Sequence, residues 1–158
     1  MRPLAVFDLD GTLADVRHRL HHLHGRRKDW DAFFDAARHD PPLATGLALV
    51  RESGHECDVV YVTGRPERCR EDTVAWLQEQ ELPKGELAMR RPGDRRPARV
   101  AKVELLRRLA RGRVVAVVVD DDDQVCDAYE EQGWTVLRAR WQATAPVLRQ
   151  AQEQEGRT

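Results

Sequence analysis

The stretch that decides the fold is Val114–Gln124, which reads VVAVVVDDDDQ. Six apolar residues, five of them valine, run without a break into four consecutive aspartates. Such a run is typical of a strand that is buried on both faces of a parallel sheet. Two carboxylates about 4 Å apart repel each other by roughly 4 kcal/mol at an effective dielectric constant near 20. Four aspartates at the end of a buried strand therefore need a cation nearby, or they must point into water.

The rest of the chain alternates between strand-like and helix-like patterns. Besides residues 114–119, short apolar runs predict strands at residues 4–8, 59–63, 86–89 and 135–138. Apolar residues at i, i+3, i+4 spacing predict helices at residues 43–53, 66–80, 98–111 and 124–132. Strands that alternate with helices form right-handed crossovers and a parallel sheet covered on both faces. The sequence thus predicts an α/β fold of three layers.

Residues 15–42 do not follow this alternation. They include a helical pattern around Trp30, Phe33 and Phe34, so we expect a small, mostly helical insertion after the first strand. No linker or repeat divides the chain, and 158 residues suffice for one core, so residues 1–158 are predicted to form a single domain. The polar C-terminal residues, ending in QAQEQEGRT, are expected to form a solvated, frayed helix.

Composition excludes several classes of protein. The formal net charge is −1, so affinity for nucleic acid must come from a local patch rather than from global charge. No apolar run is long enough to span a bilayer, and the first 25 residues lack the apolar segment of a signal peptide. Three cysteines, an odd number at wide spacing, suit a reducing compartment, and we expect a cytoplasmic location without a membrane partner.

Two pairs of aspartates lie at the ends of predicted strands. Asp8 and Asp10 follow the first strand, and Asp120 and Asp121 follow the valine run. If these strands are neighbours, their ends lie about 4.8 Å apart and the carboxylates converge. An oxygen-only, acid-rich site suits Mg²⁺, so these four residues are predicted to bind that ion. The next two aspartates, 122 and 123, are expected to begin the following helix, where the helix dipole favours acids.

A second group of residues suits a phosphate. Thr63, Gly64 and Arg65 end the second strand, which places a hydroxyl, a permissive backbone and a cation together. Lys102 is one of only three lysines in a chain rich in arginine, and it opens a predicted helix after a loop. From there its ammonium can reach an acidic pocket.

Together these stretches resemble the four ordered motifs of the haloacid dehalogenase-like (HAD) phosphatases: DLDGT at 8–12, VTGR at 62–65, Lys102, and DDDD at 120–123. In detail they are similar to the 3′-phosphatase domain of polynucleotide kinase–phosphatases, as is the arginine-rich loop MRRPGDRRP at 89–97. One departure is that Ala98 and Arg99 occupy the stretch in which those phosphatases carry an acid. No GxxxxGK[ST] phosphate-binding loop occurs, so a kinase or ligase partner would be a separate protein.

The resemblance implies a Rossmann-like HAD fold with sheet order 3-2-1-4-5 and a role for each motif. Asp8 would attack phosphorus to form an aspartyl-phosphate, and Asp10 would protonate the leaving group and then activate water. The main-chain carbonyl of Asp10, rather than its side chain, would contact the metal. Mg²⁺, Thr63 and Lys102 would stabilise the charge on the transferred phosphoryl group.

Further arginines are candidates for substrate binding. Arg17 and Arg19 in the insertion, with Gly64 and Arg65, are expected to hold the phosphate. A basic loop beside the site could follow the upstream phosphates of a nucleic acid, and its arginines are Arg90, Arg91, Arg95 and Arg96. The four histidines at 18, 21, 22 and 24 are interpreted as a solvated helix rather than a zinc site, and all four tryptophans as packing residues.

Three functions remain open from the sequence. The first is a Mg²⁺-dependent phosphatase that removes 3′-phosphates from DNA or RNA ends, and the alternative is one that acts on a small phosphomonoester such as a nucleotide or sugar phosphate. The third is a non-catalytic binding module. Intact Asp8 and Asp10 argue against the third, and the small insertion, which leaves an open site, favours the first. The oligomeric state does not follow from the sequence.

Overall fold

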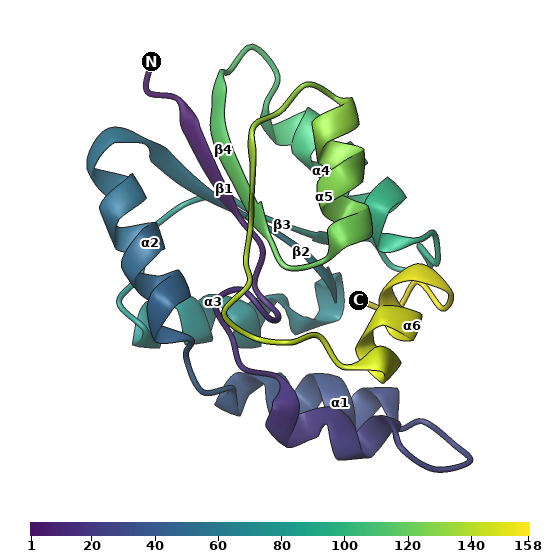
Figure 1. Ribbon diagram of the computed structural model, residues 1–158. Coiled ribbons are helices and arrows are strands. Elements are labelled where there is room, and N and C mark those ends of the chain that lie inside the picture. Colours follow the sequence, from purple (N-terminus) through teal and green to yellow (C-terminus); the bar gives the residue numbers. More distant parts are fainter.

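The computed structural model describes residues 1–158 and contains a five-stranded sheet. All strand pairs are parallel and their order is β3-β2-β1-β4-β5, as predicted. The strands are β1 (Leu4–Phe7), β2 (Asp58–Pro66), β3 (Leu87–Arg90), β4 (Val115–Asp120) and β5 (Val136–Arg138). The valine run forms β4, which lies beside β1 (Figure 1) and has β5 on its other side, so the prediction of an inner strand is confirmed. Burial is confirmed only for its second half, because Val118, Val119 and Asp120 are buried whereas Val114 and Ala116 are exposed.

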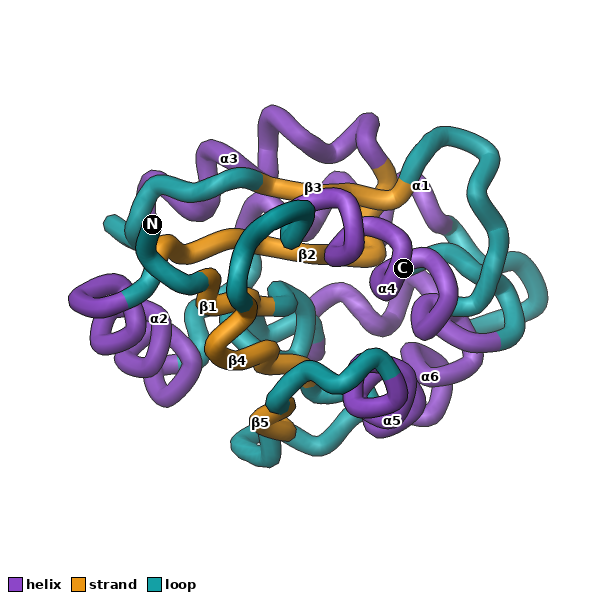
Figure 2. The backbone as a smooth tube through the Cα atoms, turned by 90° about the horizontal axis from the view of Figure 1, so that it is seen from above, coloured by secondary structure: helices purple, strands orange, loops and turns teal.

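Helices cover both faces of the sheet, as the alternation predicted. They are α2 (Ala44–Glu56), α3 (Arg70–Glu79), α4 (Ala98–Leu109) and α5 (Asp123–Glu131), and a 3-10 turn, η3 (Glu67–Cys69), precedes α3. Alternate residues of β1 separate the two cores: Phe7 packs with residues of α2 and α3, whereas Val6 packs with residues of α4 and α5. Seen from above, the strands form a layer between these two pairs of helices (Figure 2).

The stretch between β1 and α2 is helical but short in each of its parts. It contains η1 (Arg17–Leu23), α1 (Trp30–Asp35) and η2 (Ala36–His39). Phe33 and Phe34 are buried in a third apolar cluster, which also includes Leu23 and Met89. This cluster holds the insertion beside the carboxyl ends of β2 and β3, at the edge of the sheet where α/β proteins place their sites.

The expectation for the C-terminus is wrong. Residues Pro146–Glu153 form α6, and Leu148 is buried in the same apolar cluster as Phe33 and Phe34. Glu155 forms an ion pair with Lys28 of the insertion. The segment is docked rather than frayed because its few apolar residues meet an apolar face that only the folded insertion provides. None of the helices is long and apolar enough to cross a membrane.

Candidate active site

Three carboxylates meet where two neighbouring strands end. Asp8 directly follows β1, Asp120 ends β4, and the strands pair with Phe7 opposite Val119. Oxygens of Asp8, Asp120 and Asp121 lie within 4.8 Å of one another, and each of these residues is at most 5% exposed. The predicted convergence of these carboxylates is therefore observed.

Lys102 lies between two of these acids. Its Nζ donates hydrogen bonds to Oδ1 of Asp8 and Oδ2 of Asp120, both at 2.8 Å. Burial alone would lower the pKa of Lys102, but Asp120 and Asp8 outweigh burial and raise it well above its ordinary value. The hydroxyl of Thr12 donates to the other oxygen of Asp8 at 3.1 Å. Lys102, the lysine that the sequence singled out, is thus a buried ammonium in contact with Asp8.

One ammonium does not balance three buried carboxylates. Burial, followed by the charge of Asp120, raises the pKa of Asp8 to about 6. The pKa of Asp121 is raised well above its ordinary value by burial and by the other two acids. Oδ1 of Asp121 is buried without a hydrogen-bond partner, and its Oδ2 accepts only from Thr144 at 3.0 Å. The unmatched charge and the free oxygen suit a hard divalent cation, which these three acids would hold.

Gly11 makes this arrangement possible. It has φ of +81°, a conformation that residues with a side chain rarely adopt. A Cβ at this position would also collide with the carboxylate of Asp121. The glycine of the DLDGT motif therefore allows the turn after β1 to approach the acid at the end of β4. Asp122 is the N-cap of α5 and accepts from the main-chain NH of Gln124 at 2.9 Å, so its predicted role as a helix start is confirmed.

Asp10 has the opposite environment. Its Oδ1 accepts hydrogen bonds from Nη2 of Arg19 at 2.9 Å and from Nη2 of Arg65 at 2.6 Å. Burial alone would raise the pKa of Asp10, but Arg65 and Arg19 outweigh it and lower the pKa to about 2. Its Oδ2 is buried without a partner. Asp10 is therefore a fixed carboxylate with one oxygen free.

Asp40 completes this network, and the sequence analysis missed it. Its carboxylate accepts from Arg19 at 2.8 Å and from Arg65 at 3.0 Å, and Nε2 of His18 lies 2.6 Å from its Oδ1. The indole NH of Trp76 donates to the main-chain oxygen of Asp40 at 2.8 Å. A single aspartate before Pro41 carries no spacing pattern, so only its position in space identifies it.

The residues at the end of β2 that were predicted to bind phosphate, Thr63, Gly64 and Arg65, lie beside these two clusters. Thr63 is 1% exposed, and its hydroxyl accepts from the main-chain NH of Arg65 at 3.2 Å. A Cβ at Gly64 would collide with the main chain of Thr158, which lies against this strand. The C-terminal residues therefore cover the Thr63 end of the site.

The candidate arginines fall into distinct positions. Arg19 is fully buried in the Asp10 network, whereas Arg17 is exposed and paired with Asp15 at 2.6 Å, so the structure does not bring Arg17 to the site. Arg90 is also buried, and it donates to the main-chain oxygens of Gly64, Asp94, Arg96 and Thr158.

The other arginines of the basic loop are at the surface. Arg96 is paired with Asp94 and Glu104, both at 2.7 Å. Arg91 and Arg95 are exposed. In the basic loop, Arg90 is therefore buried and links main-chain segments by hydrogen bonds, whereas the other three arginines are exposed to solvent.

Comparison with known proteins agrees with this geometry. A family model described as the polynucleotide kinase PNKP phosphatase domain matches residues 3–142. Among solved structures, a chain of the Pnkp1/Rnl/Hen1 complex is similar with a TM-score of 0.73 and 25% identity over 87% of this chain. This chain spans 45% of the length of that one. No curated protein sequence matches.

A second solved structure shows that the fold is shared more widely. A class C acid phosphatase from Bacillus anthracis, with tungstate bound, has a TM-score of 0.64 and 13% identity, and the match covers 90% of this chain and 69% of that one. The match to the family model extends over most of the chain and includes Asp8, Thr63, Lys102 and Asp120. This protein is a phosphatase with the HAD fold and belongs to the family of the polynucleotide kinase PNKP phosphatase domain.

Proposed function

We propose that residues 1–158 form a single phosphatase domain that removes the 3′-phosphate from DNA or RNA ends through an aspartyl-phosphate. The observation that carries the proposal is the pair Asp8 and Asp10, which lie two residues apart in opposite environments. Asp8 lies among acids and contacts one ammonium, whereas Asp10 is held by two guanidinium groups with its Oδ2 free. The first arrangement suits a nucleophile at a metal site, and the second suits a proton carrier.

The reaction would proceed in two displacements. In the first, an oxygen of Asp8 bonds to phosphorus while the bond from phosphorus to the 3′-oxygen breaks, and Asp10 gives its proton to that oxygen. In the second, Asp10 takes a proton from water, the water oxygen bonds to phosphorus, and the bond to Asp8 breaks. Lys102 and Thr63 would donate hydrogen bonds to the phosphoryl oxygens during both displacements.

A divalent cation held by Asp8, Asp120 and Asp121, for which we propose Mg²⁺, would supply further stabilisation of phosphoryl charge. With its pKa near 2, Asp10 is ionised at neutral pH in this structure, which is the form that accepts a proton from water. To act as an acid in the first displacement it must take up a proton. We infer that its contact with Arg19, which the insertion carries, weakens when substrate binds.

Several observations support a polynucleotide as the substrate. The family is that of the polynucleotide kinase PNKP phosphatase domain, and a similar structure is a chain of the Pnkp1/Rnl/Hen1 RNA repair complex. Exposed arginines lie in the loop after β3, next to the carboxyl end of β2. We therefore propose nucleic-acid 3′ ends as the partner, with a kinase or ligase supplied separately. The free thiols of all three cysteines support a cytoplasmic location.

One assay tests this function. Phosphate release should be measured from the same DNA and RNA oligonucleotides carrying either a 3′- or a 5′-phosphate, and from free mononucleotides. We expect the 3′-phosphorylated oligonucleotides to have the highest kcat/KM. Higher kcat/KM for free mononucleotides would instead favour a small-phosphomonoester phosphatase.

A further inference from the structure

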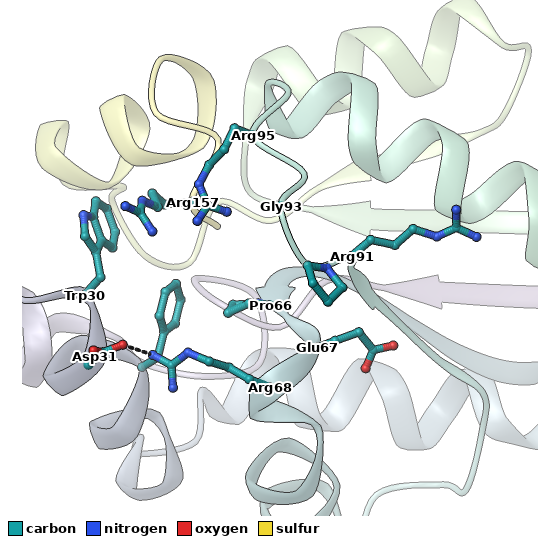
Figure 3. Close-up of a pocket in the computed structure, with 11 residues that line it drawn as sticks. Trp30, Asp31, Pro66, Glu67, Arg68, Arg91, Gly93, Arg95 and Arg157 are labelled. Atoms are coloured by element: carbon teal, nitrogen blue, oxygen red, sulfur yellow. Dashed lines mark hydrogen bonds and ion pairs between the residues drawn. The ribbon is translucent and has the colours of Figure 1, made fainter.

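A cavity of about 170 Å³ lies beside the end of β2 (Figure 3). Its walls come from the start of α1, the turn after β2, the loop after β3 and the C-terminal segment. It brings together the insertion, which the proposed mechanism uses only through Arg19 and Asp40, and the basic loop. We call it the Trp30 groove, after the aromatic ring on one side of it.

The charge in the Trp30 groove is positive. Four arginines and two acids line it, and both acids are already paired: Asp31 with Arg68 at 2.8 Å, and Glu67 with Arg70 at 2.7 Å. The guanidinium group of Arg95 donates only to the main-chain oxygen of Asp94.

Arg157 adds a second cation, which forms no direct ion pair, although Glu155 and Asp31 lie near enough to act on its charge. Burial and the nearby Arg95 lower its pKa. Figure 3 shows these two side chains close together on one side of the cavity, whereas Arg91 extends away from it. The Trp30 groove therefore offers an anion two guanidinium groups that repel each other.

Trp30 offers a flat partner next to this charge. The ring is half-buried and packs against Phe33 and Phe34, with centroids 6.0 and 6.1 Å away. The flat guanidinium group of Arg157 lies over the ring, 5.2 Å from its centroid. A nucleobase is also flat and stacks on aromatic rings irrespective of sequence. The packing predicted for Trp30 is confirmed, and its half-buried ring also lines the groove.

The groove lies near the reacting residues, on the side of Thr63. Pro66 lines it and lies three residues beyond Thr63 on the extended strand β2, which corresponds to about 10 Å. A second cavity on the other side of the site is lined by Asp121, Asp122, Asp123 and Glu153, with Arg149 as its only cation. Because a polyanion avoids the acidic side, the strand should leave the site along the Trp30 groove.

We propose that the Trp30 groove binds the nucleotide that precedes the 3′-phosphorylated one, with its base stacked on Trp30 and its phosphodiester paired with Arg95. In this arrangement the base takes the place of the Arg157 guanidinium group over the ring. The C-terminal residues then leave Gly64, which opens the covered end of the site to the terminal phosphate. The proposal rests on the proposed function and adds to it where the substrate strand lies.

Steady-state kinetics of wild type, Trp30→Ala, Trp30→Phe and Arg95→Ala test the proposal. The substrates are p-nitrophenyl phosphate and 3′-phosphorylated mono-, di- and trinucleotides, together with a trinucleotide that lacks the base preceding the 3′-phosphorylated nucleotide. Trp30→Ala should raise KM for the trinucleotide roughly tenfold. Trp30→Phe keeps a ring for stacking, so its KM should be close to that of wild type. Arg95→Ala should lower the slope of log KM against log salt by about 0.7. Neither variant should change the kinetics with p-nitrophenyl phosphate, and the abasic trinucleotide should not distinguish Trp30→Ala from wild type.

A binding measurement separates this proposal from the proposed function. An unphosphorylated oligonucleotide should quench the tryptophan fluorescence of wild type, and the quenching should be lost in Trp30→Phe but kept in the control Trp134→Phe. If wild type does not prefer 3′-phosphorylated oligonucleotides, the proposed function fails whatever the quenching shows. If wild type prefers them but Trp30→Phe retains the quenching and Arg95→Ala retains the wild-type salt slope, the groove does not hold the strand. If Trp30→Ala does not fold, Trp30→Phe and Arg95→Ala still test whether the groove holds the strand.

Discussion

Asp8 and Asp10 are separated by a single leucine, yet they belong to two clusters with different charge balance. Asp8 shares a cluster with Asp120, Asp121 and Lys102, which makes three acids and one base. That cluster carries two negative charges in excess when all its groups are ionised. Its acids have raised pKa values, and the pKa of Asp8 is about 6.

The charges in the cluster around Asp10 are balanced. Two acids, Asp10 and Asp40, face two bases, Arg19 and Arg65, and the pKa of Asp10 is lowered to about 2. The elements that carry the groups explain the difference. Strand ends and a helix of the central fold carry the first cluster, whereas the insertion contributes Arg19 and Asp40 to the second. The excess negative charge of the first cluster suits a divalent cation, whereas the balanced charge of the second keeps Asp10 ionised.

The largest expected effects come from changing the two aspartates one at a time. Asp8→Asn should abolish turnover because it removes the nucleophile, and Asp10→Asn should lower kcat roughly 10²- to 10⁴-fold because it removes the proton carrier. Their effects on metal-free stability should have opposite signs. Asp8→Asn relieves repulsion and should raise Tm, whereas Asp10→Asn leaves buried guanidinium groups with less charge to pair and should lower it.

Thermal unfolding and phosphate release measure both effects on the same samples. Mass spectrometry must exclude deamidation of the new asparagine. Wild-type turnover in Asp8→Asn would remove this residue from the proposed mechanism, and equal shifts of Tm in the two variants would contradict the difference in charge balance.

The next largest effect is expected on Tm, when one base is removed from the balanced cluster around Asp10. Arg65→Ala leaves Asp10 and Asp40 with Arg19 alone, and breaking one partner of a buried ion pair costs about 3 to 5 kcal/mol. We expect Tm to fall by about 10 °C. The matched control is Arg17→Ala, whose exposed side chain pairs only with Asp15, and its Tm should equal that of wild type. A small loss in Arg65→Ala would show that this network is not needed for folding.

A smaller effect is expected when the Tm of the metal-free protein is measured as a function of pH. An acid with a raised pKa binds protons more tightly when folded, so the stability that it contributes is lost as pH rises through the folded pKa. For Asp8 that value is about 6, so Tm should rise by a few degrees as pH falls from 7.5 to 5. The contribution of Asp10 is fully present in this range and is lost only as pH falls from about 4 toward 2. A Tm that falls steadily between pH 7.5 and 5 would contradict the excess charge around Asp8.

Much of this comparison could be predicted from sequence because it depends on local pattern. The valine run defines β4, and the alternation of strands and helices gives the sheet and its two covered faces. Strand ends carry Asp8 and Asp120, so their convergence follows once the two strands are neighbours. Lys102 stood out because lysine is rare in this chain.

The remaining features depend on contacts between segments far apart in sequence. Asp40 joins Arg19 and Arg65, which are 21 and 25 residues away, through no motif. Arg90 was predicted to be a loop arginine that contacts nucleic acid, but it is buried and donates to main-chain oxygens of two distant residues, Gly64 and Thr158. The polar C-terminal residues gave no sign that they would dock on the insertion. Periodicity reports which face of an element is apolar, not which distant segment will cover it.

The most direct test of the charge comparison is the thermal unfolding of metal-free protein at pH 7.5 with increasing Mg²⁺, at constant ionic strength, for wild type and Asp121→Asn. Wild type should show a saturable rise in Tm, because a ligand at 100 times its Kd stabilises the folded state by about 2.7 kcal/mol. Asp121→Asn should start from a higher Tm, since one repelling charge is gone, and should lose most of the response to Mg²⁺. No rise in wild type, or an equal rise in both proteins, would contradict a divalent cation site at Asp8, Asp120 and Asp121.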